Sequence, residues 1–191
     1  MRGGATNGGF IPVHGGYKKL YSYQKAEIIF LATVKFVRRW IPRGSRTRDQ
    51  LEQAARSGKQ NIVEGSMASA TSKEMEIKLT NVARASLEEL LEDYRDFLKI
   101  RGLEEWPMEH PYAKRLRELC RVPGAGYETF KKGVEHPDPA IEANVLIGLI
   151  RVASLLLDRQ IKKMEQDFLV KGGLRESMTR ARLRERNKGK R

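Results

Sequence analysis

Residues 51–98 have little freedom to form anything except two consecutive helices. Thr71-Ser72-Lys73-Glu74, near the middle of this stretch, is a capping box, in which a hydroxyl and a carboxylate satisfy amide groups at the start of a helix. The residues after it match the 3.6-residue period of a single helix face. That face consists of Met75, Leu79, Val82, Ala83, Ser86, Leu87, Leu90, Leu91, Tyr94, Phe97 and Leu98. The pattern predicts a long amphipathic helix.

The first half of the stretch predicts a helix with a narrow face of small residues. A capping box, Thr47-Arg48-Asp49-Gln50, precedes it, and Gly65 is expected to end it. The narrow face consists of Leu51, Ala54, Ala55, Gly58 and Ile62. Because most of these side chains are small, another helix can approach closely there. We interpret Asn61 and Glu64 as part of the following junction, where their side chains are expected to satisfy backbone amides.

Two more long helices are expected, at about 21–41 before Pro42 and at about 140–170 before Gly172-Gly173. Between residues 102 and 139, prolines break the periodicity, and short helices are expected at about 113–120 and 127–133. The sequence therefore predicts an all-α fold: an antiparallel, up-down-up-down four-helix bundle. The bundle covers 17–170 and includes an irregular or helical insertion at about 102–139. A flexible Gly-rich leader, 1–16, and a basic tail, 171–191, flank it.

The first and last of these four helices carry apolar residues on more than one face. Residues 28–32 are apolar all the way round, and Ile147, Ile150, Leu155 and Leu157 extend the apolar surface of the last helix. Exposed patches of that size are usually covered, which predicts a homo-oligomer. The alternative is that the insertion folds back over these helices.

The net charge of +13 suggests a polyanionic partner, and its distribution matters more than its total. Residues 171–191 hold nine basic and two acidic side chains, and residues 1–66 hold twelve and four. Residues 71–98 instead hold four basic and seven acidic side chains. Positive charge is thus segregated to the front of the chain and to its tail. A merely solvated, highly soluble surface is the alternative interpretation.

The basic residues in these two regions are the expected nucleic-acid-binding residues. Phosphate contacts need only positive charge at suitable spacing and give affinity without sequence readout. No aromatic residues are interleaved with them, which argues against base stacking on a single strand. The expected residues are Lys35, Arg38, Arg39, Arg43, Arg46, Arg48, Arg56, Lys59, Arg175, Arg180, Arg182, Arg184 and Arg186.

The sequence offers no clear catalytic or metal-binding group. His14, His110 and His136 lie in expected loops, and none stands at helical spacing from a second ligand. The lone Cys120 excludes an intrachain disulfide and a cysteine-based zinc site. An acidic run at 88–96 is expected to be a solvated face with helical ion pairs, with a magnesium site as the alternative. We expect no metal, no cofactor and no enzymatic activity; an RNA-cleaving enzyme is the minor alternative.

Several motifs resemble the four-helix-bundle family of proteins named after the intervening sequences of 23S ribosomal RNA genes. They are Tyr23-Gln24-Lys25-Ala26, Gln53-Ala54-Ala55-Arg56-Ser57, Asn61-Ile62-Val63-Glu64-Gly65, Ser72-Lys73-Glu74 and Ala85-Ser86-Leu87-Glu88-Glu89-Leu90. A subgroup with a "four helix bundle suffix" is similar at Leu157-Asp158-Arg159-Gln160, Glu165-Gln166-Asp167-Phe168-Leu169, Gly172-Gly173-Leu174-Arg175-Glu176 and Arg180-Ala181-Arg182. Related accessory proteins of diversity-generating retroelements are basic pentameric barrels that bind nucleic acid beside a reverse transcriptase. The resemblance implies a homopentamer and no catalytic residue.

The sequence and the resemblance together predict a non-enzymatic, homo-oligomeric adaptor. It is expected to bind RNA or DNA through the backbone and to assist a reverse transcriptase or another nucleic-acid enzyme encoded nearby. The alternative is a structural scaffold that docks an acidic protein partner. No signal peptide is recognised, and the uninterrupted apolar stretches, 28–31 and 145–150, are too short to span a bilayer. A cytoplasmic protein without membrane contact is therefore expected.

Overall fold

The computed structural model describes residues 15–188, and all regular structure in that range is helical. The all-helical class predicted from the sequence is therefore confirmed. The elements are η1 (Tyr17–Lys19, a 3-10 turn), α1 (Tyr21–Trp40), α2 (Arg46–Ala68), α3 (Lys73–Ile100), α4 (Pro111–Arg121), α5 (Tyr127–Val134), α6 (Pro139–Lys171) and α7 (Leu174–Lys188). Of the predicted leader, only Gly15 and Gly16 lie within the described residues.

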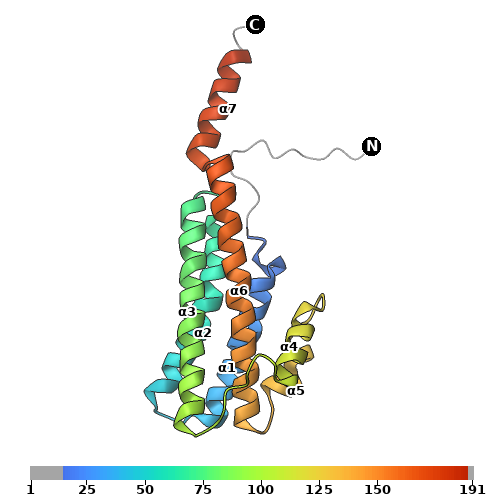
Figure 1. Ribbon diagram of the computed structural model, residues 1–191. Coiled ribbons are helices and arrows are strands. Elements are labelled where there is room, and N and C mark those ends of the chain that lie inside the picture. The colour runs from blue at the N-terminus through green and yellow to red at the C-terminus, as the bar shows by residue number, and fades with distance from the viewer. Residues whose placement is uncertain (1–14, 189–191) are drawn as a thin grey trace, which may run out of the picture.

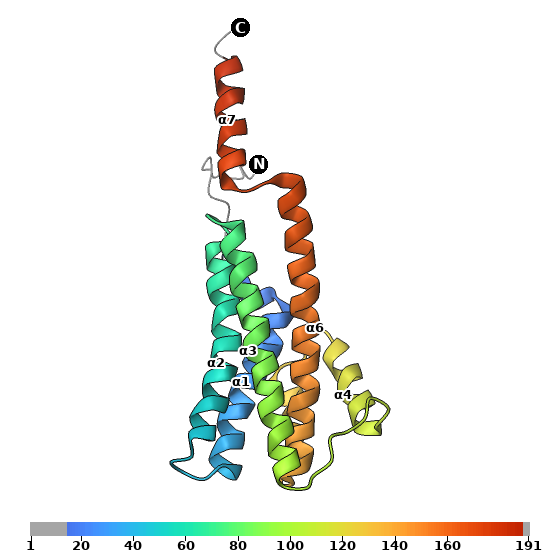
Figure 2. The same cartoon turned by 60° about the vertical axis from the view of Figure 1, so that its left-hand side comes forward.

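Helices α1, α2, α3 and α6 lie side by side around one core (Figures 1 and 2). Helix α2 packs against α3, α3 packs against α6, and α1 packs against both α2 and α6. Three aromatic rings join α1 to α3, because Phe36 makes edge-to-face contacts with Tyr94 at 5.0 Å and with Phe97 at 4.7 Å. The largest side chains of the core are fully buried; they include Ile29, Leu51, Ile62, Leu87, Leu90, Leu146 and Leu149.

Close contact between α2 and α3 depends on two glycines inside α2. A Cβ atom at Gly58 would lie 2.7 Å from Leu87 Cδ2, and one at Gly65 would lie 3.3 Å from the Glu76 carbonyl oxygen. The expectation that Gly65 ends this helix is wrong: α2 continues to Ala68. Gly65 is needed because the backbones approach each other there, and a side chain would separate them.

The starts of α2 and α3 differ from the expected capping boxes by one or two residues. Ser72, not Thr71, caps α3, and its hydroxyl accepts a hydrogen bond from Met75 N at 3.1 Å. Helix α2 begins at Arg46, so Thr47 lies inside its first turn, and Ser45 precedes it without a side-chain cap. Asn61 does not bind the junction either. Its amide donates to the Ser57 carbonyl one turn earlier at 2.9 Å, because residues four apart share a helix face.

The inward face of α3 is narrower than the periodicity predicted. Val82 and Met75 are each 46% exposed, because the surfaces of α2 and α6 meet α3 without reaching that side. Thr80 is buried instead, and its hydroxyl donates to the Glu76 carbonyl at 2.8 Å beside Gly65. On α6, Phe168 is 38% exposed, because the end of that helix has few neighbours.

The insertion contains both expected short helices and covers the first half of α6. Helices α4 and α5 both pack against α6, and α5 also contacts α1. Ile147 and Ile150 are buried, whereas Leu155, further along α6, is 50% exposed. The insertion therefore covers only part of the apolar surface of α6.

Lys25 of α1 fastens the insertion to the bundle. Its side chain is 2% exposed, and Nζ donates to the carbonyl of Ala125 at 3.2 Å beside the Phe130 ring. Burial lowers the pKa of this amine. Burying a lysine costs free energy, and the hydrogen bond to Ala125 offsets part of that cost. The same hydrogen bond holds the loop between α4 and α5 in one position against α1.

Helix α6 contains a segment that is apolar and long enough, by length and composition alone, to cross a membrane. Of its most apolar window, 61% is buried against the rest of the described chain. This burial is typical of the core helix of a folded domain.

Candidate nucleic-acid interface

The thirteen expected phosphate-binding residues form two groups, one on α1, α2 and the connection between them, and one on α7. Arg38 to Arg48 surround the short connection between α1 and α2, at the lower end in Figures 1 and 2, whereas α7 projects from the other end. Helix α6 connects the two ends and has 33 residues, which corresponds to about 50 Å. A single short nucleic-acid segment therefore cannot contact both groups on one chain at once.

Four arginines of α1, α2 and the connection between them stand outside the ion pairs of the described chain. Arg38, Arg43, Arg46 and Arg56 are exposed, and no ion pair to any of them exists among residues 15–188. Arg56 borders a hollow that Val34 of α1 and the acidic Asp49 and Glu52 of α2 also line. Arg38 lies one turn beyond Val34 on the same side of α1. We call these four residues the basic end.

The other expected cations in α1 and α2 are already engaged. Lys35 pairs with Glu135 at 2.5 Å, and Arg48 pairs with Glu52 at 3.7 Å. Lys59 lies over the ring of Phe30, with 4.4 Å from Nζ to the centroid. These three side chains thus take part in contacts within the chain.

Arg39 binds a buried carboxylate at the start of α6. Glu142 is 0% exposed; Oε2 accepts hydrogen bonds from Arg39 Nη1 at 3.1 Å and from Trp40 Nε1 at 2.7 Å. Arg39 Nη2 also donates to the carbonyl of His136 at 3.0 Å. The second oxygen, Oε1, has no hydrogen-bond partner among the described residues. Burial raises the pKa of Glu142, although Trp40 and Arg39 oppose the shift.

Glu142 predicts a specific pH dependence of stability. Because its pKa is raised in the folded state, its contribution is fully present below the unfolded pKa and is lost as the pH rises through the folded value. Glu142→Gln keeps an acceptor for Trp40 but cannot ionise. The free energy of unfolding of the wild type, measured by urea titration from pH 4.5 to 7.5, should therefore fall relative to that of the variant. Glu118→Gln on exposed α4 is the control, and parallel curves for the wild type and Glu142→Gln would contradict the prediction.

The fold adds one cation that spacing along the chain did not reveal. Arg101, just after α3, donates to the carbonyl of Trp40 at 3.2 Å and stacks over Phe97 at 3.8 Å. Its charge therefore lies close to the basic end. The two contacting residues are 61 positions apart, so no local pattern could have indicated the contact.

The arginines of the tail lie on two sides of α7. Arg180 and Arg184 share one side, whereas Arg175, Arg182 and Arg186 share the opposite side, because side chains four or seven residues apart lie on the same face. Arg180 also donates to the carbonyl of Lys171 at 2.5 Å. One phosphate backbone can thus contact only part of this set.

The histidines and the cysteine of the described residues take part in local contacts. His136 Nδ1 accepts from Asp138 N at 3.0 Å, and His110 stacks on Trp106 at 4.5 Å; His14 lies outside the described residues. Burial raises the pKa of the half-buried Cys120 thiol, which makes it less reactive. Among residues 15–188, no three His, Cys, Asp or Glu side chains are grouped so that they could hold a metal ion.

The acidic run of α3 forms the exposed face that was expected. Glu92 pairs with Arg95 at 2.5 Å, and Asp96 pairs with Lys99 at 3.8 Å. Arg84 reaches across to α6 and pairs with Asp158 at 3.2 Å. Burial raises the pKa of Asp93, helped by the neighbouring Glu89 and Asp96.

No known protein family, curated protein or solved structure matches this chain. The fold and the composition define the class as a basic, all-helical protein.

Proposed function

We propose that this protein is a non-enzymatic nucleic-acid-binding adaptor that contacts the phosphate backbone of RNA or DNA without sequence preference. The observation that carries the proposal is the basic end, where four exposed arginines have no acidic partner within residues 15–188. Unpaired guanidinium groups release counterions from nucleic acid when they bind phosphate, which supplies affinity. Within residues 15–188, the two aromatic side chains with more than half of their surface exposed, Tyr21 and Tyr112, lie elsewhere.

The proposal includes the finer architecture and the setting. We take the fold to be an antiparallel, up-down-up-down four-helix bundle of α1, α2, α3 and α6, with α4 and α5 as the insertion. Its support is the closed set of neighbours, in which each of the four helices contacts two others. The motif resemblance to the intervening-sequence family favours a cytoplasmic accessory protein that assists a reverse transcriptase or a related enzyme encoded nearby.

We further propose a homo-oligomer, with a ring of five preferred because of that resemblance. Apolar side chains that remain exposed support self-association; they include Leu31, Val82, Leu155, Leu169 and Val170. Since the insertion covers part of α6, the interface should involve the uncovered second half of that helix. Sedimentation at micromolar concentration should give a mass several times that of the 21.8 kDa chain. A mass near that of one chain would contradict the proposal.

Deleting residues 180–191 tests whether the tail takes part in binding. The deletion should weaken binding to a labelled 30-base-pair duplex and reduce the salt dependence, because fewer counterions are released. The measurement is an electrophoretic shift titrated at two salt concentrations. The oligomer should persist, since its apolar side chains lie outside the deletion. If the full chain and the deletion variant have equal affinity and equal salt dependence, the tail takes no part in nucleic-acid binding. Displacement of the duplex by an acidic peptide would then favour the protein-docking alternative.

A further inference from the structure

Helices α4 and α5 leave a hollow between them on the surface of α6. Each packs against α6, and the space bordered by the three helices measures about 440 Å³. This volume falls within the range of small-molecule sites. Its walls are mainly aromatic and aliphatic side chains: Trp106, Tyr112, Leu116, Leu119, Phe130, Ile141 and Val145.

Two glycines allow α4 and α5 to pack closely against α6, and this close packing fixes the walls of the hollow. A Cβ atom at Gly148 of α6 would lie 2.4 Å from Leu116 Cδ2, and one at Gly133 of α5 would lie 3.1 Å from Val145 Cγ2. Asn144 of α6 makes two hydrogen bonds to the segment that precedes α4. It accepts from Trp106 N at 2.7 Å and donates to the Glu104 carbonyl at 2.9 Å. The hollow is therefore preformed, because both of its flanks are fastened to α6.

The two charged side chains that border the hollow, Arg115 and Lys132, are both cationic. Arg115 of α4 and Lys132 of α5 border it together with His136, and no acidic side chain lines it. Arg115 pairs with Glu118 at 3.1 Å, whereas Lys132 has no ion-pair partner among residues 15–188. The arrangement complements a molecule with an apolar body and an anionic head.

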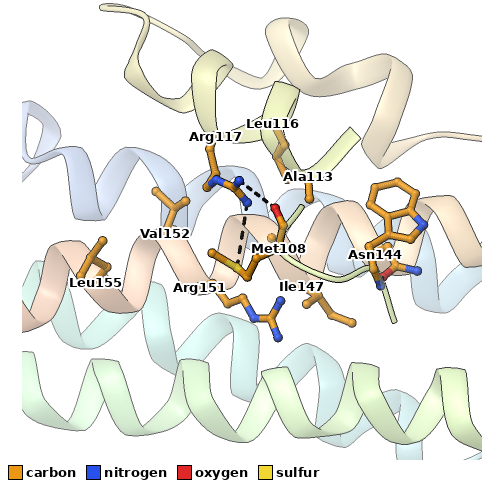
Figure 3. Close-up of a pocket in the computed structure, with 11 residues that line it drawn as sticks. Met108, Ala113, Leu116, Arg117, Asn144, Ile147, Arg151, Val152 and Leu155 are labelled. Carbon is orange, nitrogen blue, oxygen red and sulfur yellow. Dashed lines mark hydrogen bonds between the residues drawn. The ribbon is translucent and has the colours of Figure 1, made fainter. Parts of the chain in front are cut away.

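The smaller cavity on the other flank of α4 lacks this character. It measures about 140 Å³, and its two arginines are both engaged. Arg117 donates to the Met108 carbonyl at 2.8 Å (Figure 3). Arg151 pairs with Glu105. Asn144 also lines this cavity, and its side chain is bonded to the Trp106 amide and the Glu104 carbonyl. The larger hollow differs because Lys132 borders it and has no ion-pair partner among residues 15–188.

We propose that the hollow between α4 and α5 binds an amphipathic carboxylate, whose apolar body contacts Phe130, Leu119 and Val145 and whose carboxylate lies between Lys132 and Arg115. This site is separate from the basic end and does not depend on nucleic-acid binding. Each charge-assisted hydrogen bond to the carboxylate adds to the affinity that apolar burial provides.

Equilibrium dialysis of the full chain against labelled decanoate tests the proposal. We expect saturable binding, and we expect the double variant Arg115→Gln, Lys132→Gln to weaken it by at least about tenfold. The matched control replaces Lys114 and Lys131, which lie on the same two helices but do not line the hollow, and should bind like the wild type. Decanol, which has no charge, should bind more weakly than decanoate and be unaffected by either double variant.

A second variant separates loss of charge from loss of space. Leu119→Trp fills the hollow without changing charge and should abolish binding of both probes, while circular dichroism confirms that the helices persist. No saturable binding of decanoate, undiminished binding by Leu119→Trp, or equal losses in the two double variants would overturn the proposal. If decanoate does not bind and Leu119→Trp dissociates the oligomer, a second copy of the chain covers this face instead.

Discussion

Replacing Arg38, Arg43, Arg46 and Arg56 with glutamine is expected to cause the largest loss of nucleic-acid binding available to this chain. Each phosphate contact contributes about 0.9 to the slope of log affinity against log salt on duplex DNA, so losing four reduces the slope by about 3.6. Between 50 and 200 mM salt, the wild type should therefore lose about 150-fold more affinity than the variant. Fluorescence anisotropy with a labelled 30-base-pair duplex over that salt range measures both slopes.

A variant with the same change in net charge provides the control. Lys78, Lys114, Arg121 and Lys162 are exposed cations away from the basic end, and their replacement by glutamine removes the same four charges. If the slope of log affinity against log salt falls equally in both quadruple variants, nucleic acid binds through the protein's overall charge. The basic end then has no special part. Unchanged salt slopes in both variants would mean that α7 binds the nucleic acid instead.

The second large effect concerns the contact between Gly58 and Leu87. Gly58→Val places a Cβ atom within 2.7 Å of Leu87 Cδ2, and Leu87 is 0% exposed, so the side chain has no space into which it can move. Overpacking of this kind costs about 2 kcal/mol of unfolding free energy. Leu87→Ala removes the obstruction but leaves a cavity, which costs about 3 kcal/mol. Urea unfolding at one fixed protein concentration measures both.

The double variant makes the contact itself measurable. If valine at position 58 occupies space vacated by Leu87, the cost of the double variant should be smaller than the two single costs together by at least about 1 kcal/mol. Gln60→Val, on the exposed side of α2, controls for the effect of a β-branched residue on helix formation. Additive costs would mean that α2 and α3 move apart to accommodate the valine.

The basic end was only partly predictable from the sequence. Positive charge near Arg38 and Arg46 is visible as composition, but which charges are available depends on their partners. Arg39 is occupied by Glu142, 103 positions away, and Lys35 by Glu135, 100 positions away. Arg101 joins this end only through the contact of α3 with the last turn of α1. Long-range pairing of charges leaves no periodic trace in a sequence, so only folding separates free cations from paired ones.

The helices themselves were determined by the sequence. Apolar spacing, Pro42, Ser72 and Gly172 set most helix boundaries to within one or two residues, because hydrogen bonding and capping within a helix are local. Tertiary structure alone decided the rest. Gly65 lies inside α2 because the backbone of α3 occupies the space beside it. Val82 is exposed because no helix packs against that side of α3. Lys25 is buried because the insertion folds over α1. These outcomes depend on packing between distant segments, which local periodicity does not encode.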